Sequence, residues 1–120
     1  MARKMTVDVR DDELFTIIDV VGEVDIQTSP ELVSIVSEVT DGPADHLVFD
    51  LAGVTFMDST GLAALVLARK KMMLRQGSVE LIVTTRRVRA ILTLAGLDQV
   101  FRVHPSIHSV RVGEDPAEPA

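Results

Sequence analysis

Apolar and polar positions follow two different periods along the chain, and together they predict strands that alternate with helices. Residues 5–10 and 14–21 are rich in β-branched side chains and flank a short acidic stretch, which predicts an opening β-hairpin. Residues 47–49 are a continuous apolar run, as is typical of central strands covered on both faces, and residues 79–83 predict another apolar strand. A shorter run at 100–103 predicts a last strand.

The first predicted helix follows the loop 22–25, at which the second strand is expected to end. Ser29 is an N-cap candidate, because Pro30 takes the next position and a glutamate follows near the positive end of the helix dipole. Thr28, with a glutamate three residues later, forms a competing capping box. The glycine and proline at 42–43 are expected to end the helix.

Two further helices are predicted after the central strands. One follows residues 57–61 and ends near Gly77, whereas Thr85 caps the other and Gly96 follows its last turn. The apolar positions expected to face the core are Leu62, Leu65, Val66 and Met73 in one helix, and Val88, Ile91, Leu92 and Ala95 in the other. The order of elements predicts an α/β fold, with a mixed, mostly parallel sheet of about five strands and helices packed on it.

Composition narrows this picture to one domain. The 120 residues are 47% hydrophobic and fit a single core, which we place at residues 5–110, with an acidic, proline-containing and flexible tail at 111–120. No apolar run reaches the roughly 18 residues of a membrane-spanning helix, and no signal-peptide core follows the first residues. Cysteine is absent, which excludes thiol nucleophiles and disulfide scaffolds. We therefore expect a cytoplasmic domain without a membrane partner, as a monomer or weak dimer.

Charge divides the chain into unlike halves. The net charge is −6, with 3 basic and 13 acidic side chains among residues 1–60 and 9 basic and 5 acidic ones in the remainder. A net-acidic domain lacks the field that phosphate binding uses, so we expect no direct nucleic-acid partner. The cations on the predicted helices are expected to be solvated, with a second contact surface or a phosphate-binding patch as the alternative; they are Arg69, Lys70, Lys71, Arg75, Arg86, Arg87 and Arg89.

Most catalytic and ligand-binding motifs are missing from the sequence. There is no P-loop and no Gly-x-Gly-x-x-Gly motif. His104 and His108 are four residues apart, but Pro105 opposes the helix that would align them as metal ligands. We therefore interpret both as surface histidines and expect no metal and no cofactor.

The sequence Asp58-Ser59-Thr60-Gly61 stands out, because it follows the central strand at the edge where open α/β sheets place their sites. Met57 replaces the first glycine of a hydrolase nucleophile elbow and no histidine is placed as its base. The single copy and the glycine spacing also fail to match an aspartic-protease loop, so we expect no enzyme. Two interpretations remain compatible: Asp58 or Ser59 caps the next helix, and a hydroxyl there accepts a regulatory phosphate.

These motifs, in order over residues 5–110, resemble the STAS domain of anti-sigma factor antagonists, also called anti-anti-sigma factors. The Gly-Glu-Val-Asp loop at 22–25 resembles the family's first loop. Residues 50–62, Asp-Leu-Ala-Gly-Val-Thr-Phe-Met-Asp-Ser-Thr-Gly-Leu, resemble its strongest signature, the Asp-[Ser/Thr]-[Ser/Thr]-Gly-Leu turn. Gly77 and the Ala-Gly-Leu sequence at 95–97 resemble later landmarks.

The resemblance implies a regulator that switches partners. In that family the serine of the turn, here Ser59, is phosphorylated by an anti-sigma factor that is also an ATP-dependent serine kinase, and a serine phosphatase resets it. The unphosphorylated form binds the kinase and releases a sigma factor. The alternative phosphoacceptor is Thr60, and the alternative function is a STAS interaction subunit of a stress-signalling complex or lipid-transport machine without this switch. The implied partner-binding residues are Glu23, Asp25, Asp58, Ser59, Thr60, Gly61 and Leu62.

Overall fold

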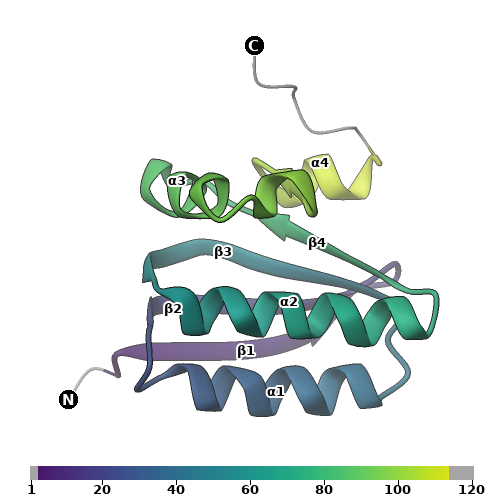
Figure 1. The fold of residues 1–120 in the computed structure, drawn as a ribbon. Helices are drawn as coiled ribbons and strands as arrows, with labels where there is room; N and C mark the ends of the chain where they lie inside the picture. The colour runs from purple at the N-terminus through teal and green to yellow at the C-terminus, as the bar shows by residue number, and fades with distance from the viewer. Residues whose placement is uncertain (1–2, 114–120) are drawn as a thin grey trace.

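A five-stranded mixed sheet forms the centre of the fold (Figure 1). The structure is a computed structural model and describes residues 3–113. The strands lie in the order of the chain, with β1 antiparallel to β2 and all later pairs parallel. Their bounds are β1 Met5–Asp11, β2 Thr16–Val24, β3 His46–Met57, β4 Ser78–Ile82 and β5 Arg102–His104. The predicted α/β fold with its opening hairpin is confirmed.

The first three helices connect the parallel strands, and each of them starts at the edge where those strands end. Figure 1 shows α1 and α2 side by side along the sheet, whereas α3 contacts β3 and α4 contacts β5. Their bounds are α1 Ser29–Asp41, α2 Ser59–Leu74, α3 Arg86–Leu94 and α4 Ile107–Arg111, with a short 3₁₀ turn, η1, at Leu97–Gln99. Because β2 to β5 are parallel, the loops that lead into α1, α2 and α3 share one edge of the sheet, which we call the carboxyl edge.

Alternate residues of the central strands enter two separate cores. On one face, Phe49 of β3 packs in a large cluster that also holds Leu32, Leu65 and Val88 from α1, α2 and α3. On the other face, Val48 belongs to a small cluster formed with α4. The period of two along the strands thus explains why β3 is apolar at successive positions.

Several predicted boundaries differ from the observed ones. Residues 22–24 do not leave the second strand but continue it, paired with the far end of a β3 that is longer than the apolar run 47–49. Ser29 is the first residue of α1 rather than its cap, and Thr28 takes the cap position without a side-chain cap bond. The Thr28 hydroxyl instead donates to the Glu23 carbonyl at 2.9 Å. The Thr28 side chain therefore bonds to the preceding loop and does not form the predicted capping box.

The buried helix faces also differ in part from the predicted ones. In α2, Met72 is buried whereas Met73 is about half exposed, and Val66 is only half-buried. In α3, Val88 and Leu92 are buried, but Ala95 is exposed beyond the end of the helix. Gly96 does follow α3 in the left-handed conformation, with φ of +75°.

The prediction of a surface histidine at position 104 is wrong. His104 is fully buried, and its ring nitrogens lie 2.6 Å from the Ser109 hydroxyl and 2.8 Å from a Glu80 carboxylate oxygen. These contacts connect β5 to β4 and to α4, a helix that the sequence does not predict. Arg111, placed above in the tail, ends α4, and residues 114–120 lie outside the described residues.

Candidate functional site

The turn between β3 and α2 is built around one carboxylate. Asp58 is the N-cap of α2, and its Oδ1 atom accepts hydrogen bonds from the Thr60 amide at 2.9 Å and the Gly61 amide at 3.4 Å. The same oxygen accepts the Thr60 hydroxyl at 2.5 Å. Of the two predicted cap candidates, Asp58 is therefore the cap, and Ser59 begins the helix.

The two neighbouring hydroxyls of the turn have different environments. Ser59 is exposed, and its hydroxyl makes no hydrogen bond with any residue between 3 and 113. Thr60 is half-buried, and its hydroxyl is held by Asp58. Ser59 consequently presents an unengaged hydroxyl at the first turn of a helix, where the positive end of the dipole favours an added anion.

Gly61 allows α2 to start close to the ends of two strands. A Cβ atom at this position would lie 2.6 Å from Cγ of Met57 and 2.8 Å from Cγ1 of Val24, both of which are buried. A larger residue would push the helix start away from the sheet. The glycine thus fixes where Ser59 lies relative to β2 and β3.

The loop between β2 and α1 is fastened to the same turn. The Asp58 amide donates to the Val24 carbonyl at 3.0 Å, which joins the ends of the two strands. Asp25 organises the loop by accepting hydrogen bonds from the Gln27 and Thr28 amides at 2.9 and 3.2 Å. Its other oxygen pairs with Lys4. The structure therefore brings the predicted loop 22–25 and the predicted turn together at the carboxyl edge.

Both carboxylates of this site are held in the ionised form. The pKa of Asp58 lies below its ordinary value, chiefly because its carboxylate accepts the Thr60 hydroxyl, with the backbone amides adding to the effect. The pKa of Asp25 is lowered chiefly by the hydrogen bond from Lys4. Each carboxylate also repels the other, since Asp25 acts to raise the pKa of Asp58. The site is therefore anionic at neutral pH.

Exposed apolar side chains that sequence reasoning missed also lie around the site. Ile26 follows Asp25 in the loop and is 73% exposed, and Phe56, in register with Glu23, is 38% exposed. The available signal was an isoleucine inside an otherwise polar loop. Apolar side chains beside charged ones are typical of protein-binding surfaces rather than of catalytic pockets.

A shallow apolar groove of about 410 Å³ begins at Ser59. It runs between α2 and the segment that follows α3, and is lined by Ser59, Leu62, Ala63, Val66, Ala95 and Leu97. Leu62, the last residue of the predicted partner-binding set, is half-buried at its start. The surface around Ser59 is thus open and elongated, which suits a protein segment better than a small substrate.

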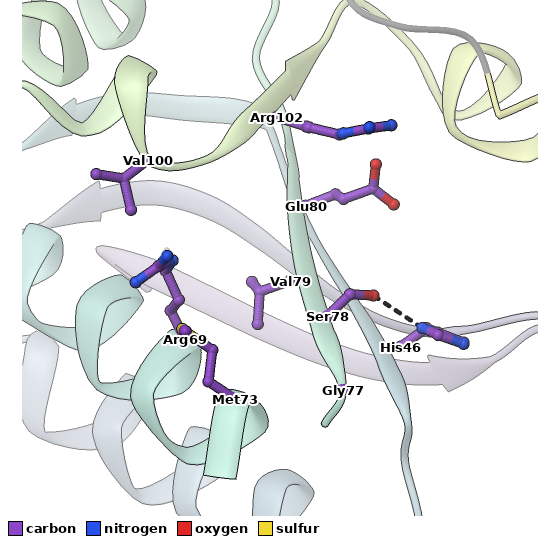
Figure 2. A pocket seen from close by; sticks show the side chains of 9 residues that line it. All are labelled: His46, Arg69, Met73, Gly77, Ser78, Val79, Glu80, Val100 and Arg102. Atoms are coloured by element: carbon purple, nitrogen blue, oxygen red, sulfur yellow. Dashed lines mark hydrogen bonds between the residues drawn. The ribbon is translucent and has the colours of Figure 1, made fainter. Parts of the chain in front are cut away.

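A larger hollow of about 500 Å³ lies at the opposite end of the parallel strands and contains none of the predicted site residues. Figure 2 shows that its side chains lie on both sides of β4. Arg69, Met73, Val79 and Val100 lie on the α2 side, whereas Ser78, His46, Glu80 and Arg102 lie on the other. The hydrogen bond between Ser78 and His46, 2.8 Å long, joins β4 to β3. Because the polar groups do not converge, this hollow is a poor candidate for a binding site.

Across residues 3–113, no group of three or more histidine, aspartate or glutamate side chains is placed to hold a metal ion. In the same part of the chain, no helix has both the length and the apolar character required to cross a membrane.

Replacing Asp58 by alanine should lower the free energy of unfolding at neutral pH, because the variant lacks the side-chain oxygen that accepts the Thr60 and Gly61 amides. Because the folded protein lowers the pKa of Asp58 below 3.8, the carboxylate stabilises the fold above that pH, and this stabilisation is lost as the pH falls through the folded-state pKa. The difference between the variant and the wild type, measured by urea unfolding, should therefore shrink on acidification. A difference that stayed constant from pH 7 to strongly acidic pH would contradict a role for the ionised cap.

Comparison with known proteins identifies the family. Residues 5–110 match the sequence profile of the STAS domain. The chain belongs to the STAS domain family. It is 32% identical over 116 residues to the anti-sigma-F factor antagonist RsfB of Mycobacterium tuberculosis (strain ATCC 25618 / H37Rv), an alignment that covers 91% of this chain and 88% of RsfB.

Solved STAS structures have the same fold. The crystal structure of an anti-sigma factor antagonist from Mycobacterium paratuberculosis is 27% identical and superposes with a TM-score of 0.85, over 91% of this chain and 92% of that one. The anti-sigma factor antagonist SpoIIAA in its unphosphorylated form has a TM-score of 0.75 at 17% identity, over 90% of this chain and 96% of SpoIIAA. The resemblance to the STAS family that the motifs indicate is thereby confirmed.

Proposed function

We propose that this STAS-domain protein is an anti-sigma factor antagonist that binds an anti-sigma factor through the carboxyl edge and is released from it by phosphorylation of Ser59. The bound anti-sigma factor would free its sigma factor. The relationship to RsfB, named as an anti-sigma-F factor antagonist, supports the general role. The observation that carries the site assignment is the contrast between the unengaged Ser59 hydroxyl and the engaged hydroxyl of Thr60.

The proposed switch follows from charge. A kinase, proposed to be the anti-sigma factor itself, would form a bond between the Ser59 oxygen and the γ-phosphorus of ATP, with loss of the hydroxyl proton and release of ADP. The modification adds about −1.5 to −2 charges beside Asp58 and Asp25. The helix N-terminus tolerates the phosphate, so the fold is retained. A partner surface that contacts an uncharged serine does not tolerate it, and a serine phosphatase would restore binding.

The partner surface is proposed to combine charged and apolar contacts. Glu23, Asp25 and Asp58 make the carboxyl edge acidic, so the partner should present a basic patch, and association should slow as salt increases. Thr60 and Gly61 shape the turn, and Leu62 provides apolar contact at the mouth of the groove. Ile26 and Phe56 are the exposed apolar side chains best placed to extend this contact.

Ser59→Ala should abolish phosphoryl transfer to the protein. Wild-type protein incubated with ATP and its cognate kinase should gain one phosphoryl group by intact mass, and the alanine variant should gain none. Thr60→Val, which removes the alternative hydroxyl and nearly keeps the side-chain volume, is the matched control and should still be labelled. Labelling of Ser59→Ala together with its loss in Thr60→Val would assign the modification to Thr60. Tight binding to the anti-sigma factor without any labelling would instead favour an interaction subunit that lacks the switch.

A further inference from the structure

Two cations of α2 have partners in the fold, whereas Arg69 and Lys70 of the same helix make no hydrogen bond or ion pair within residues 3–113. Lys71 of α2 lies 3.5 Å from Asp41 of α1, and Arg75 donates to the Thr40 and Gly42 carbonyls at 2.6 and 2.5 Å. Arg75 therefore satisfies carbonyl groups at the end of α1, where a cation is favourable. The expectation that it is simply solvated is wrong, because the fold itself accounts for this residue.

The cations of α3 have no such structural role. Arg86, Arg87 and Arg89 are exposed, and none of them makes a hydrogen bond or an ion pair within residues 3–113. They stand in the first turn and a half of α3, which has no acidic residue in its first turn. Positive charges at the start of a helix oppose its dipole, so these arginines do not help α3 to form.

The outer face of α3 combines these cations with apolar surface. Leu94 is 89% exposed, the highest value among the large hydrophobic residues exposed in the described chain. Positions 86, 90 and 94 are four residues apart and so lie along one stripe of the helix, opposite the buried Val88 and Leu92. A shallow hollow of about 510 Å³ along this stripe is lined by Arg86, Arg89, Ala90, Thr93 and Leu94, which we call the α3 face.

We propose that the α3 face is a docking surface for an acidic, amphipathic segment of a partner protein. Charge complementarity identifies the occupant, because the segment must supply the carboxylates that Arg86 and Arg89 of this face lack within the described chain. An apolar side chain of the same segment covers Leu94. Arginine beside an exposed aliphatic residue is typical of protein interfaces.

The size of the α3 face sets the strength of this contact. The helix has nine residues and spans about 13 Å, which leaves room for two or three turns of a partner helix. An interface of this size buries less area than stable complexes do, so the contact is transient by itself. It requires neither Ser59 nor its phosphorylation, and it therefore adds a second partner-binding surface to the one proposed above.

The test uses a short synthetic helical peptide with glutamates on one side and leucines on the other, titrated into the full chain labelled with ¹⁵N. We expect amide shifts concentrated in residues 86–97 and no binding of a peptide in which lysines replace the glutamates. The double variant R86E/R89E should bind the acidic peptide about tenfold or more weakly, and L94S severalfold more weakly. These residues are exposed, so circular dichroism should show an unchanged fold.

The matched control is R69E/K70E, which changes the net charge equally on α2. It should keep wild-type affinity for the acidic peptide. Equal weakening in both double variants would overturn the proposal, because attraction would then depend on overall charge.

The proposal would also be overturned if phosphatidylglycerol vesicles or single-stranded DNA, but not the peptide, bound in a manner that R86E/R89E abolishes. Self-association lost in R86E/R89E without peptide binding would assign the face to a second copy of this chain.

Discussion

Ser59→Asp should bind the anti-sigma factor at least about a hundredfold more weakly than the wild type, measured by titration calorimetry with the unmodified proteins. The new carboxylate would stand beside Asp58 in a contact from which water is removed. Like charges brought together at an interface cost several kcal/mol, and about 2.7 kcal/mol already corresponds to a hundredfold change in the dissociation constant. The folded state should tolerate the change, since an acidic residue is favourable in the first turn of α2.

Two control variants test whether the loss of affinity comes from the charge at position 59, from the size of the new side chain, or from the net charge of the protein. Ser59→Asn has nearly the same volume as the aspartate variant but no charge, and should lose much less affinity. Ser34 is exposed on α1, so Ser34→Asp adds the same charge outside the proposed contact and should bind nearly as the wild type does. Raising the salt concentration should reduce the difference in affinity for the anti-sigma factor between Ser59→Asp and Ser59→Asn. Wild-type affinity in Ser59→Asp would contradict the proposed switch while leaving the family assignment untouched.

The turn around Ser59 is predictable from sequence because its determinants are local. An apolar strand, an aspartate at the cap position and a glycine three residues later specify a strand–turn–helix unit without help from distant residues. The same holds for the left-handed Gly96 at the end of α3. What the sequence leaves open is which hydroxyl of the turn is engaged. That depends on the rotamer by which Thr60 reaches Asp58, and it becomes visible only in three dimensions.

The errors of sequence interpretation concern contacts between residues far apart in the chain. His104 is buried because Glu80, 24 residues earlier, and Ser109 on the unpredicted α4 supply partners for both ring nitrogens. Arg75 is fixed by carbonyls at the end of α1, more than 30 residues away. Polarity predicts solvent exposure for both side chains, but a polar group is buried readily once its hydrogen bonds are satisfied. Short elements such as α4 depend on such contacts rather than on periodicity.

The extension of β2 through residues 22–24 also depends on contacts with residues far away in the chain. It contains Gly22, the position of the site at which an added side chain would meet the closest atom. The Glu23 amide donates to the Lys4 carbonyl at 3.0 Å, which keeps β1 beside the end of β2. Gly22 adopts a φ of +106°, and a Cβ atom there would lie 2.2 Å from that same Lys4 oxygen. The backbone of β1 cannot retreat without breaking this hydrogen bond, which lies two residues before Asp25. Glycine is therefore required at position 22 by both conformation and space.

Gly22→Ala should accordingly lower the free energy of unfolding by about 3 kcal/mol or more, since backbone strain of about 1 to 3 kcal/mol is joined by a clash with main chain. Gly96→Ala is the control, because Gly96 also has a positive φ, of +75°, but nothing lies within 4 Å of its absent Cβ. It should cost only about 1 to 2 kcal/mol. Both values are measurable by urea unfolding monitored by circular dichroism. Equal losses would show that φ alone restricts position 22, whereas a larger loss for Gly22→Ala, together with weakened binding to the anti-sigma factor, would show that the approach of β1 positions the Asp25 loop.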